Sequence, residues 1–449
     1  MAKHTWAQNT VREPQSVAAE RALLVGVLRN GKPLTDDPLA ELAELARSAG
    51  ADVVARVIQR RRSPHPATCV GKGKLEEIRQ KIDSADAQIV VFDLDLSPSQ
   101  IREIEAVIER RVLDRSELIL DIFATRARTH EARLQVELAQ LEYTAPRLRG
   151  MWTHLERIAG AGGATGVGAV GGIGTRGPGE RQIEIDRRIV GKRVAFLKRK
   201  IAEIDRRKVR EVRARKEHFT VSLVGYANAG KSTLMNALTQ ARAKTEDRLF
   251  ATLDTLTRRW PLGDGRSVLL SDTVGFVRDL PHRLVASFRA TLEEAIHADL
   301  LLHVVDATSL DAEAQIAAVQ AVLDELGLHE RPILLLLNKI DALRDESLLP
   351  ILQSKHADAI SLSAKTGRGL DTLRDAVAAR MRGEQRRVAL SIPAQDTKAQ
   401  NFLDRFAEVF DRRIDDGRMV FDVGISPRAL EQLHGLARDV RHIEHEEPT

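Results

Sequence analysis

The sequence predicts a multidomain α/β protein with four parts: an N-terminal parallel α/β domain, an antiparallel coiled-coil-like helical hairpin, a second α/β domain and a small C-terminal α+β domain. Three patterns support this prediction. Apolar strands alternate with helices of about ten residues near the N-terminus. Apolar residues then follow heptad spacing in two stretches. Finally, an apolar strand runs directly into a glycine-rich loop and a helix. The 449 residues suffice for about three domains of roughly 150 residues each.

Composition excludes several classes of protein. With 43% hydrophobic and 30% charged residues, the chain has enough apolar side chains to build cores, so a disordered chain is excluded. The single cysteine, Cys69, excludes an intrachain disulfide and is typical of a reducing compartment. The longest apolar runs fall far short of the about 20 residues that span a bilayer, and the polar N-terminus lacks the apolar segment of a signal peptide. We therefore expect a cytoplasmic monomer without a transmembrane segment; peripheral membrane association stays open.

The net charge of +5 is distributed unevenly along the chain. Residues 187–216 hold 14 Lys and Arg against 3 Asp and Glu, whereas residues 219–385 hold 19 basic against 22 acidic side chains. A solvated helix face explains part of this excess, but the local charge of +11 exceeds what solubility needs. The asymmetry favours a basic module that contacts a polyanion, attached to a nearly neutral domain with another role.

The N-terminal α/β domain is predicted over residues 18–128, after a tail over residues 1–17. Strands that alternate with helices pair in parallel, because each helix returns the chain to the same edge of the sheet. The segment 71–74, Gly-Lys-Gly-Lys, opens one helix and can hold an anion, although we favour a solvated helix start. The expected strands are Arg21–Leu28, Ala51–Ile58, Ala87–Phe92 and Arg111–Val112, and the expected helices are Leu39–Ala49, Gly73–Ile82 and Ser99–Arg110.

Residues 129–216 are predicted to form the helical hairpin. Pro146 is expected to kink its first arm because proline lacks a backbone N–H. A loop over residues 159–179, in which 10 of 21 residues are glycine, joins the arms. Its two G-x-G-x-x-G matches follow a helix instead of a strand, so we interpret the loop as a mobile tip and not as a dinucleotide site. The seam is expected at Leu134, Leu138, Leu141, Ala145, Leu148, Trp152 and Leu155, and at Val190, Val194, Leu197, Ile201 and Ile204.

The second α/β domain, residues 217–385, begins with a phosphate-binding loop. The apolar strand Thr220–Val224 runs into G-x-x-x-x-G-K-S and then a helix, which is the setting that this motif requires. Backbone N–H groups wrap the α- and β-phosphates, Lys231 lies along the β- and γ-phosphates, and the Ser232 hydroxyl ligates Mg²⁺. The predicted nucleotide contacts are Gly225, Tyr226, Ala227, Asn228, Ala229, Gly230, Lys231, Ser232 and Thr233.

Three further motifs in this domain indicate that the nucleotide is GTP. Asp272 ends a strand and can hold the Mg²⁺ shell through water, and the N–H of Gly275 can reach the γ-phosphate. A carboxylate at Asp341 accepts from N1–H and the amine of guanine, a pattern that adenine lacks, so the site rejects ATP. These motifs contribute Asp272, Thr273, Val274 and Gly275, then Asn338, Lys339, Ile340 and Asp341, and finally Ser363, Ala364 and Lys365 behind the base.

The motif set resembles the translation-factor-related GTPases, and its details resemble the HflX family. The run 272–282 is similar to the switch II of that family almost residue for residue. Segments 70–76, 121–131, 152–157 and 177–180 are also HflX-like, so the resemblance covers nearly the whole chain. It implies that switch I comprises Phe250, Ala251, Thr252, Leu253 and Asp254.

The resemblance implies that Thr252 completes the Mg²⁺ ligands Ser232 and Asp272. The family usually has Pro-Thr where this chain has Thr255-Leu256, so Thr255 is an alternative ligand. Arg181 replaces the threonine that the family usually shows after Gly-Pro-Gly-Glu, which adds charge near the hairpin tip.

Phe276 stands where Ras-like enzymes place the glutamine that orients the attacking water. A phenylalanine side chain has no hydrogen-bonding group, so no residue at this position orients the water. The candidate catalytic groups are Lys231 and the Gly275 N–H. We expect slow hydrolysis that a partner accelerates. Phe276 also reads as a simple packing residue, and both roles are compatible.

Residues 386–449 are predicted to form the C-terminal α+β domain. No set of residues in it suggests a catalytic or metal-binding site. His434, His442 and His445 lack metal-ligand spacing and are interpreted as surface residues. The resemblance implies that this domain contacts a ribosomal protein. The expected elements are strand Val388–Ile392, helix Ala399–Phe410, strand Met419–Ile425 and helix Pro427–Leu436.

Together these features predict a GTPase attached to a basic hairpin that suits an RNA-rich partner. The resemblance implies binding near the peptidyl-transferase region of the large ribosomal subunit, and splitting or rescue of ribosomes under stress. Two alternatives stay open: a GTPase that assists ribosome assembly, and an RNA-binding protein that senses GTP without hydrolysing it. A nucleotide-dependent activity of the N-terminal domain also stays open. The candidate RNA contacts are Arg176, Arg181, Arg187, Arg188, Lys192 and Arg193.

Overall fold

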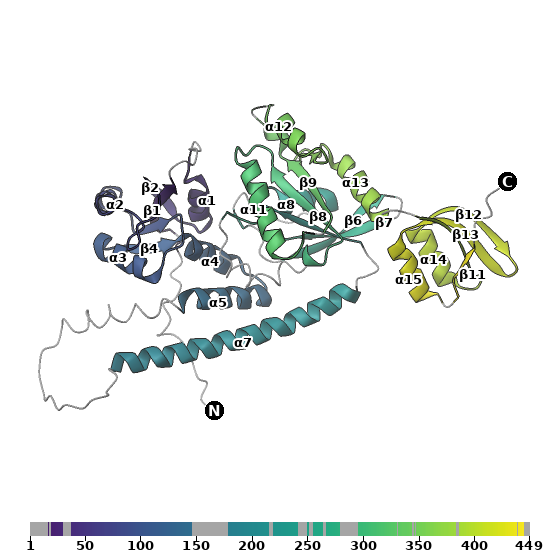
Figure 1. Cartoon of the computed structure of the whole chain (residues 1–449), viewed down its shortest axis with the longest axis horizontal. Coiled ribbons are helices and arrows are strands. Elements are labelled where there is room, and N and C mark those ends of the chain that lie inside the picture. Colours follow the sequence, from purple (N-terminus) through teal and green to yellow (C-terminus); the bar gives the residue numbers. More distant parts are fainter. Residues whose placement is uncertain are drawn as a thin grey trace, which may run out of the picture.

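The described part of the computed structural model contains three sheets with their helices, and one long helix runs alongside the N-terminal and central sheets (Figure 1). Among the described residues, no helix is long and apolar enough to cross a membrane. The predicted multidomain α/β fold is confirmed. The structure describes residues 17, 19–29, 37–145, 178–214, 219–240, 249–250, 255–263, 266–278, 295–329, 331–343, 345, 347–382, 386–437 and 439–443, with the backbone alone at 29, 178–187, 205, 208–214, 382 and 428.

The N-terminal unit contains a four-stranded sheet of order β2-β1-β3-β4. All of its strand pairs are parallel, as predicted. Helix α4 is absent from the sequence prediction: it follows β4 without a loop, and the Asp114 side chain caps it by accepting the Glu117 N–H at 2.9 Å. The elements are β1 Arg21–Arg29, α1 Ala40–Ser48, β2 Asp52–Arg61, α2 Lys72–Ala85, β3 Ile89–Phe92, α3 Pro98–Ile108, β4 Arg111–Asp114 and α4 Arg115–Arg126.

Helices α5 (His130–Thr144) and α7 (Pro178–Ala214) pack along the predicted heptad seam. Two ion pairs flank this seam: Glu137 with Arg193 at 2.6 Å, and Glu142 with Lys198 at 2.8 Å. In heptad terms the first joins two g positions and the second two e positions, which is the pairing of antiparallel helices. Seam positions 148, 152 and 155 and the kink at 146 lie outside the described residues. The packed residues are Leu134, Leu138, Leu141, Val194, Leu197, Ile201 and Ile204.

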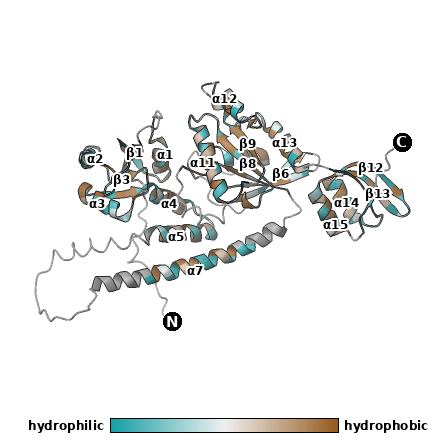
Figure 2. Cartoon of the chain, in the orientation of Figure 1, coloured by the Kyte–Doolittle hydropathy of each residue, from teal (hydrophilic) through white to brown (hydrophobic). Residues whose placement is uncertain are grey.

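The central unit contains a six-stranded sheet of order β10-β9-β8-β5-β7-β6. Its strands pair in parallel except β6, which is antiparallel to β7. The middle strands β8 and β9 are hydrophobic, as Figure 2 shows in brown, because helices cover both faces. The elements are β5 Thr220–Gly225, α8 Lys231–Thr239, β6 Leu256–Gly263, β7 Arg266–Asp272, β8 Leu300–Asp306, α11 Ala312–Glu325, β9 Ile333–Asn338, a 3₁₀ turn at Ile340–Ala342, α12 Leu348–Lys355, β10 Ile360–Ser361 and α13 Leu370–Arg382.

The C-terminal unit is a βαββαβ arrangement with the sheet order β12-β13-β11-β14, in which every strand pair is antiparallel. The helix predicted over 399–410 extends too far: α14 ends at Phe406, and Phe410 lies in the edge strand β12. Strand β12 turns into β13 at Asp416-Gly417, both with positive φ; an Asp-Gly pair is typical of a tight hairpin turn, and the sequence prediction did not use it. The elements are β11 Arg386–Pro393, α14 Thr397–Phe406, β12 Glu408–Asp415, β13 Arg418–Ile425, α15 Pro427–Leu436 and β14 Arg441–Ile443.

The N-terminal and central units share one hydrophobic cluster. Residues of α1 and α4, such as Leu42 and Phe123, belong to the same buried cluster as Tyr226, Phe250 and Phe276 of the central unit. A buried cation lies at the border of this cluster. Arg115, 3% exposed, pairs with Asp93 at 2.7 Å and with Glu41 of α1. Burial opposes its charge, but the two carboxylates raise the pKa of Arg115 above its ordinary value, so the guanidinium stays charged.

Replacing Arg115 with methionine is expected to destabilise the protein by about 3–5 kcal/mol, because two carboxylates then remain near the core without their cation. Urea unfolding followed by circular dichroism measures this change. Arg79→Met is the matched control: its pair with Glu109 is exposed and 4.0 Å long, so its loss should cost less than about 1 kcal/mol. Equal unfolding midpoints for the two variants would contradict the assigned role of Arg115.

Candidate nucleotide-binding site

The glycine-rich loop connects the end of β5 to the start of α8, as predicted. Its backbone adopts left-handed conformations at Asn228 (φ 63°) and Gly230 (φ 95°). A Cβ atom on Gly230 would stand 2.4 Å from Nδ2 of Asn338, so only glycine fits there. The loop therefore presents its N–H groups at the N-terminus of α8, an arrangement that binds anions such as phosphate.

Lys231 is buried beneath this loop. Its Nζ donates to the carbonyl of Gly225 at 3.0 Å and to that of Tyr226 at 2.8 Å. Burial lowers the pKa of Lys231 to about 8, against the opposing attraction of Asp272. The ammonium group is thus desolvated and directed along the inside of the loop, where a phosphate would restore its ordinary preference for the charged form.

Two of the predicted oxygen ligands for Mg²⁺, Ser232 and Asp272, lie side by side next to the loop. The Ser232 hydroxyl donates to Oδ2 of Asp272 at 2.6 Å. Mg²⁺ prefers such hard oxygen ligands, together with water and phosphate, so this donor set fits the metal. Thr252 lies outside the described residues, whereas Thr255 is described just ahead of β6.

The opposite end of the site is formed by the turn after β9. Asn338, 1% exposed, donates from Nδ2 to the carbonyl of Ala229 at 2.9 Å and accepts the Ala364 N–H at 2.9 Å. It thereby joins the glycine-rich loop to the loop after β10. Asp341 is exposed, and its Oδ1 accepts from the Ser363 hydroxyl at 2.5 Å. This contact orients the carboxylate that is expected to select guanine.

Residues 274–278, which lie within the predicted switch II (272–282), lie against the glycine-rich loop. The Phe276 N–H donates to the Gly225 carbonyl at 3.1 Å, and the Ala227 N–H donates to the Phe276 carbonyl at 2.6 Å. The Phe276 side chain is 2% exposed and belongs to the cluster shared with the N-terminal unit. Phe276 is therefore a packing residue in this conformation.

The structure brings the P-loop, the start of switch II and the guanine-side motifs to one edge of the central sheet. Positions 251–254 of switch I, and Arg176 among the candidate RNA contacts, lie outside the described residues. Arg181 and Arg187 are described by their backbone alone, in α7. Arg188 and Lys192 are exposed on α7. The charge of Arg193 is compensated by the ion pair with Glu137.

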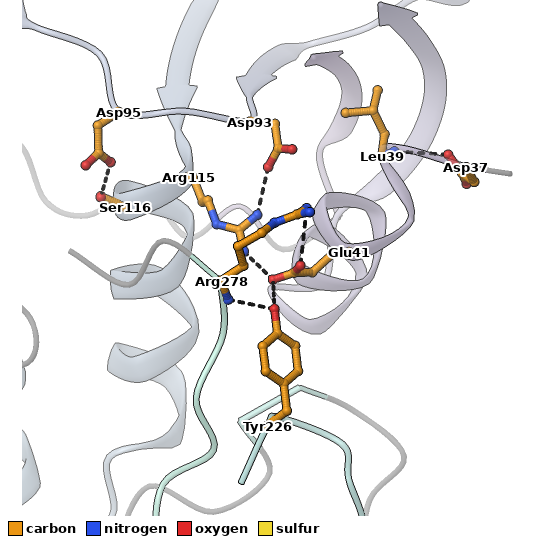
Figure 3. A network of polar contacts seen from close by, with 9 residues as sticks. All are labelled: Asp37, Leu39, Glu41, Asp93, Asp95, Arg115, Ser116, Tyr226 and Arg278. Atoms are coloured by element: carbon orange, nitrogen blue, oxygen red, sulfur yellow. Dashed lines mark hydrogen bonds and ion pairs between the residues drawn. The ribbon is translucent and has the colours of Figure 1, made fainter. Parts of the chain in front are cut away.

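Sequence reasoning missed a polar network that links the N-terminal unit to this site (Figure 3). Glu41 of α1 lies among Arg115, the Tyr226 hydroxyl and the Arg278 side chain. Glu41 and Tyr226 are 185 positions apart, so no periodicity or spacing points to their contact. The available signal was the bulky polar residue at the second position of the glycine-rich loop.

Comparison with known proteins matches family models to most of the chain. The GTP-binding GTPase N-terminal model matches residues 36–124, and the GTP-binding GTPase middle-region model matches residues 126–215. The 50S ribosome-binding GTPase model matches residues 220–339. These spans cover the N-terminal sheet, α5 and α7, and the phosphate-binding end of the central unit.

Curated relatives match nearly the full length. The GTPase HflX of Caldanaerobacter subterraneus subsp. tengcongensis is 43% identical, over 93% of this chain and 94% of the relative. The GTPase HflX of Escherichia coli K12 is 44% identical, over 86% of this chain and 88% of the relative. With four sequence motifs gathered at one sheet edge and relatives of this identity over most of its length, the chain belongs to the HflX family of GTPases.

Proposed function

We propose that this GTPase binds the large ribosomal subunit, and that it splits or rescues stalled ribosomes under stress with hydrolysis accelerated by the subunit. The match of residues 220–339 to the 50S ribosome-binding GTPase model is the observation that carries this proposal. The exposed basic side chains of α7, including Arg188 and Lys192, supply a surface suited to RNA phosphates near the peptidyl-transferase region. GTP hydrolysis then resets the factor.

In this proposal separate residues at the sheet edge contact the phosphates, the metal ion and the guanine base of GTP. Lys231 neutralises the β- and γ-phosphates, and the N–H of Gly275 donates to the γ-phosphate. Ser232 and Asp272, the latter through water, would hold Mg²⁺ with Thr252 or Thr255. When bound, Mg²⁺ supplies compensation for the negative charge that develops on the phosphate oxygens. Asp341 accepts from the guanine edge.

Hydrolysis by the isolated chain is expected to be slow. The buried ring of Phe276 offers no hydrogen bond to an attacking water, whereas glutamine at this position orients that water in Ras-like enzymes. The missing group or the ordering of switch II must come from the partner. Docking of the subunit therefore controls when the γ-phosphate is released.

Phosphate release from GTP and ATP, with and without purified large subunits at two salt concentrations, tests this function. We expect strong stimulation by the subunit for GTP only, decreasing at high salt because RNA phosphates dominate the contact. Fast turnover without subunits would contradict the role given to Phe276. GTP binding without any phosphate release would favour a GTP sensor. Stimulation combined with accumulation of immature subunits in a deletion strain, and no splitting in vitro, would favour an assembly factor.

The affinity for GDP should fall with rising pH because of Lys231. Burial lowers the pKa of this residue to about 8 in the free protein, whereas bound phosphates hold the proton. Well below pH 8 the lysine is protonated in both states and affinity is constant. Above pH 8 the free protein loses the proton, and affinity should fall by up to about tenfold per pH unit. Titration of a fluorescent GDP analogue between about pH 7 and 9 measures this slope.

Lys231→Met is the matched control for this pH series. It should bind the analogue weakly and without the decline above pH 8, because no titrating group remains beside the phosphates. If the affinity of the unchanged protein for the analogue does not vary with pH, Lys231 keeps its proton throughout this range and the prediction is wrong.

Asp341→Asn should lower GTP affinity by at least about 100-fold, because the site then offers a donor to the N1–H and amine of guanine. Xanthosine triphosphate carries a carbonyl in place of that amine, so the variant should prefer it. Competition titrations with both nucleotides measure the change. Asp345→Asn, a few residues away in a loop where its carboxylate binds Ser347, is the control and should leave the preference for GTP intact.

A further inference from the structure

The Tyr226 hydroxyl joins three parts of the molecule (Figure 3). Tyr226 belongs to the glycine-rich loop, and its side chain leaves that loop toward the N-terminal unit. The hydroxyl donates to Oε1 of Glu41 in α1 at 2.8 Å and accepts the backbone N–H of Arg278, in switch II, at 2.6 Å. Burial and the neighbouring Glu41 carboxylate raise the pKa of Tyr226, so the hydroxyl keeps the proton that it donates.

Glu41 is a fixed point for these contacts. Its carboxylate pairs with the buried Arg115, which Asp93 holds from the other side at 2.7 Å. The side chain of Arg278 adds a second link, with Nη2 3.4 Å from Oε2 of Glu41. Switch II is therefore attached to α1 twice, once through its backbone and Tyr226 and once through its own arginine.

This attachment holds switch II where a γ-phosphate has to enter. The backbone of Phe276 is hydrogen-bonded to Gly225 and Ala227, and a Cβ atom on Gly275 would lie 2.7 Å from Cα of Ala227 and 3.0 Å from Nζ of Lys231. A phosphoryl group that contacts both the Lys231 ammonium and the Gly275 N–H must lie between them. Switch II therefore has to move outward for GTP, whereas GDP carries no such group.

The N-terminal unit also holds the start of switch I. The Ser48 hydroxyl, in the last turn of α1, accepts the Leu249 N–H at 3.1 Å. The next residue, Phe250, has a φ of 56°, which is unfavourable for a bulky side chain. Its ring packs edge to face on Phe123 of α4, with centroids 4.6 Å apart. The two helices thus retain a conformation that the isolated loop would avoid.

We propose that Tyr226 is a positioning residue that ties switch II to Glu41, so that the N-terminal unit disfavours GTP relative to GDP. The inference rests on the proposed GTP site and adds a control of its nucleotide preference. GTP binding must break the Tyr226–Arg278 contact and weaken the hold on α1. By linkage, a partner that draws α1 away from the glycine-rich loop raises the affinity for GTP by the same factor by which GTP raises the affinity for that partner.

Tyr226→Phe in the full-length chain tests the proposal, because it deletes the hydroxyl and keeps the ring. Dissociation constants are measured for GDP and for a slowly hydrolysed GTP analogue, without ribosomes. The ratio of the GTP-analogue constant to the GDP constant should fall about 3- to 10-fold, as expected for loss of one or two hydrogen bonds in the closed state. Tyr143→Phe is the matched control, since the Tyr143 hydroxyl of α5 bonds to Asp114 of the N-terminal unit, and it should leave the ratio unchanged.

Glu41→Gln approaches the same contact from the N-terminal unit, with the exposed Glu44→Gln of the same helix as its control. Glu41→Gln should shift the ratio in the same direction, and the double variant with Tyr226→Phe should shift it less than the product of the two. Equal weakening of both nucleotides, or an unchanged ratio, overturns the proposal. Absence of subunit-stimulated hydrolysis together with a shifted ratio would instead refute the ribosomal role and leave this inference standing.

Discussion

The buried charge of Arg115 constrains how the two α/β units meet. A guanidinium excluded from water requires carboxylate partners, and the fold supplies Asp93 after β3 and Glu41 in the first turn of α1. Glu41 is thereby fixed at the border between the units, with an oxygen available to Tyr226. The apolar cluster brings the units together without direction, whereas this polar network determines which residue of the nucleotide site faces which residue of α1.

The side chain of Phe276 affects both the packing between the units and the expected rate of hydrolysis. Its ring completes the apolar cluster between the units, and the same ring leaves no polar group beside the proposed γ-phosphate position. A glutamine buried at this place would need hydrogen-bond partners that an apolar cluster lacks. Docking of the N-terminal unit and slow unassisted hydrolysis are therefore expected to accompany each other in this chain.

The sequence predicted the features that local spacing determines and missed those that depend on distant residues. The P-loop, the strand before it and the heptad seam follow from short patterns, and the four motifs meet because parallel strands end at one edge. Helix α4 was missed because it follows β4 without a turn signal, and β12 because its exposed, charged edge lacks an apolar alternation. The contact between Glu41 and Tyr226 depends on how two separately encoded units dock, which no window of sequence contains.

The helical hairpin is connected to both units that meet at the Glu41–Tyr226 contact. Helix α5 packs on the N-terminal unit through Val136 and Ala139, which belong to the shared cluster, and α7 precedes β5, the strand that ends in the P-loop. A ligand that binds along α7 therefore acts on an element connected to both sides of the Glu41–Tyr226 contact. Because that contact consists of a few hydrogen bonds beside a half-exposed arginine, it can break at a cost that binding to a large RNA surface readily offsets. If this chain binds the ribosome as proposed, the hairpin is the part of the molecule best placed to convert that binding into a change of nucleotide preference.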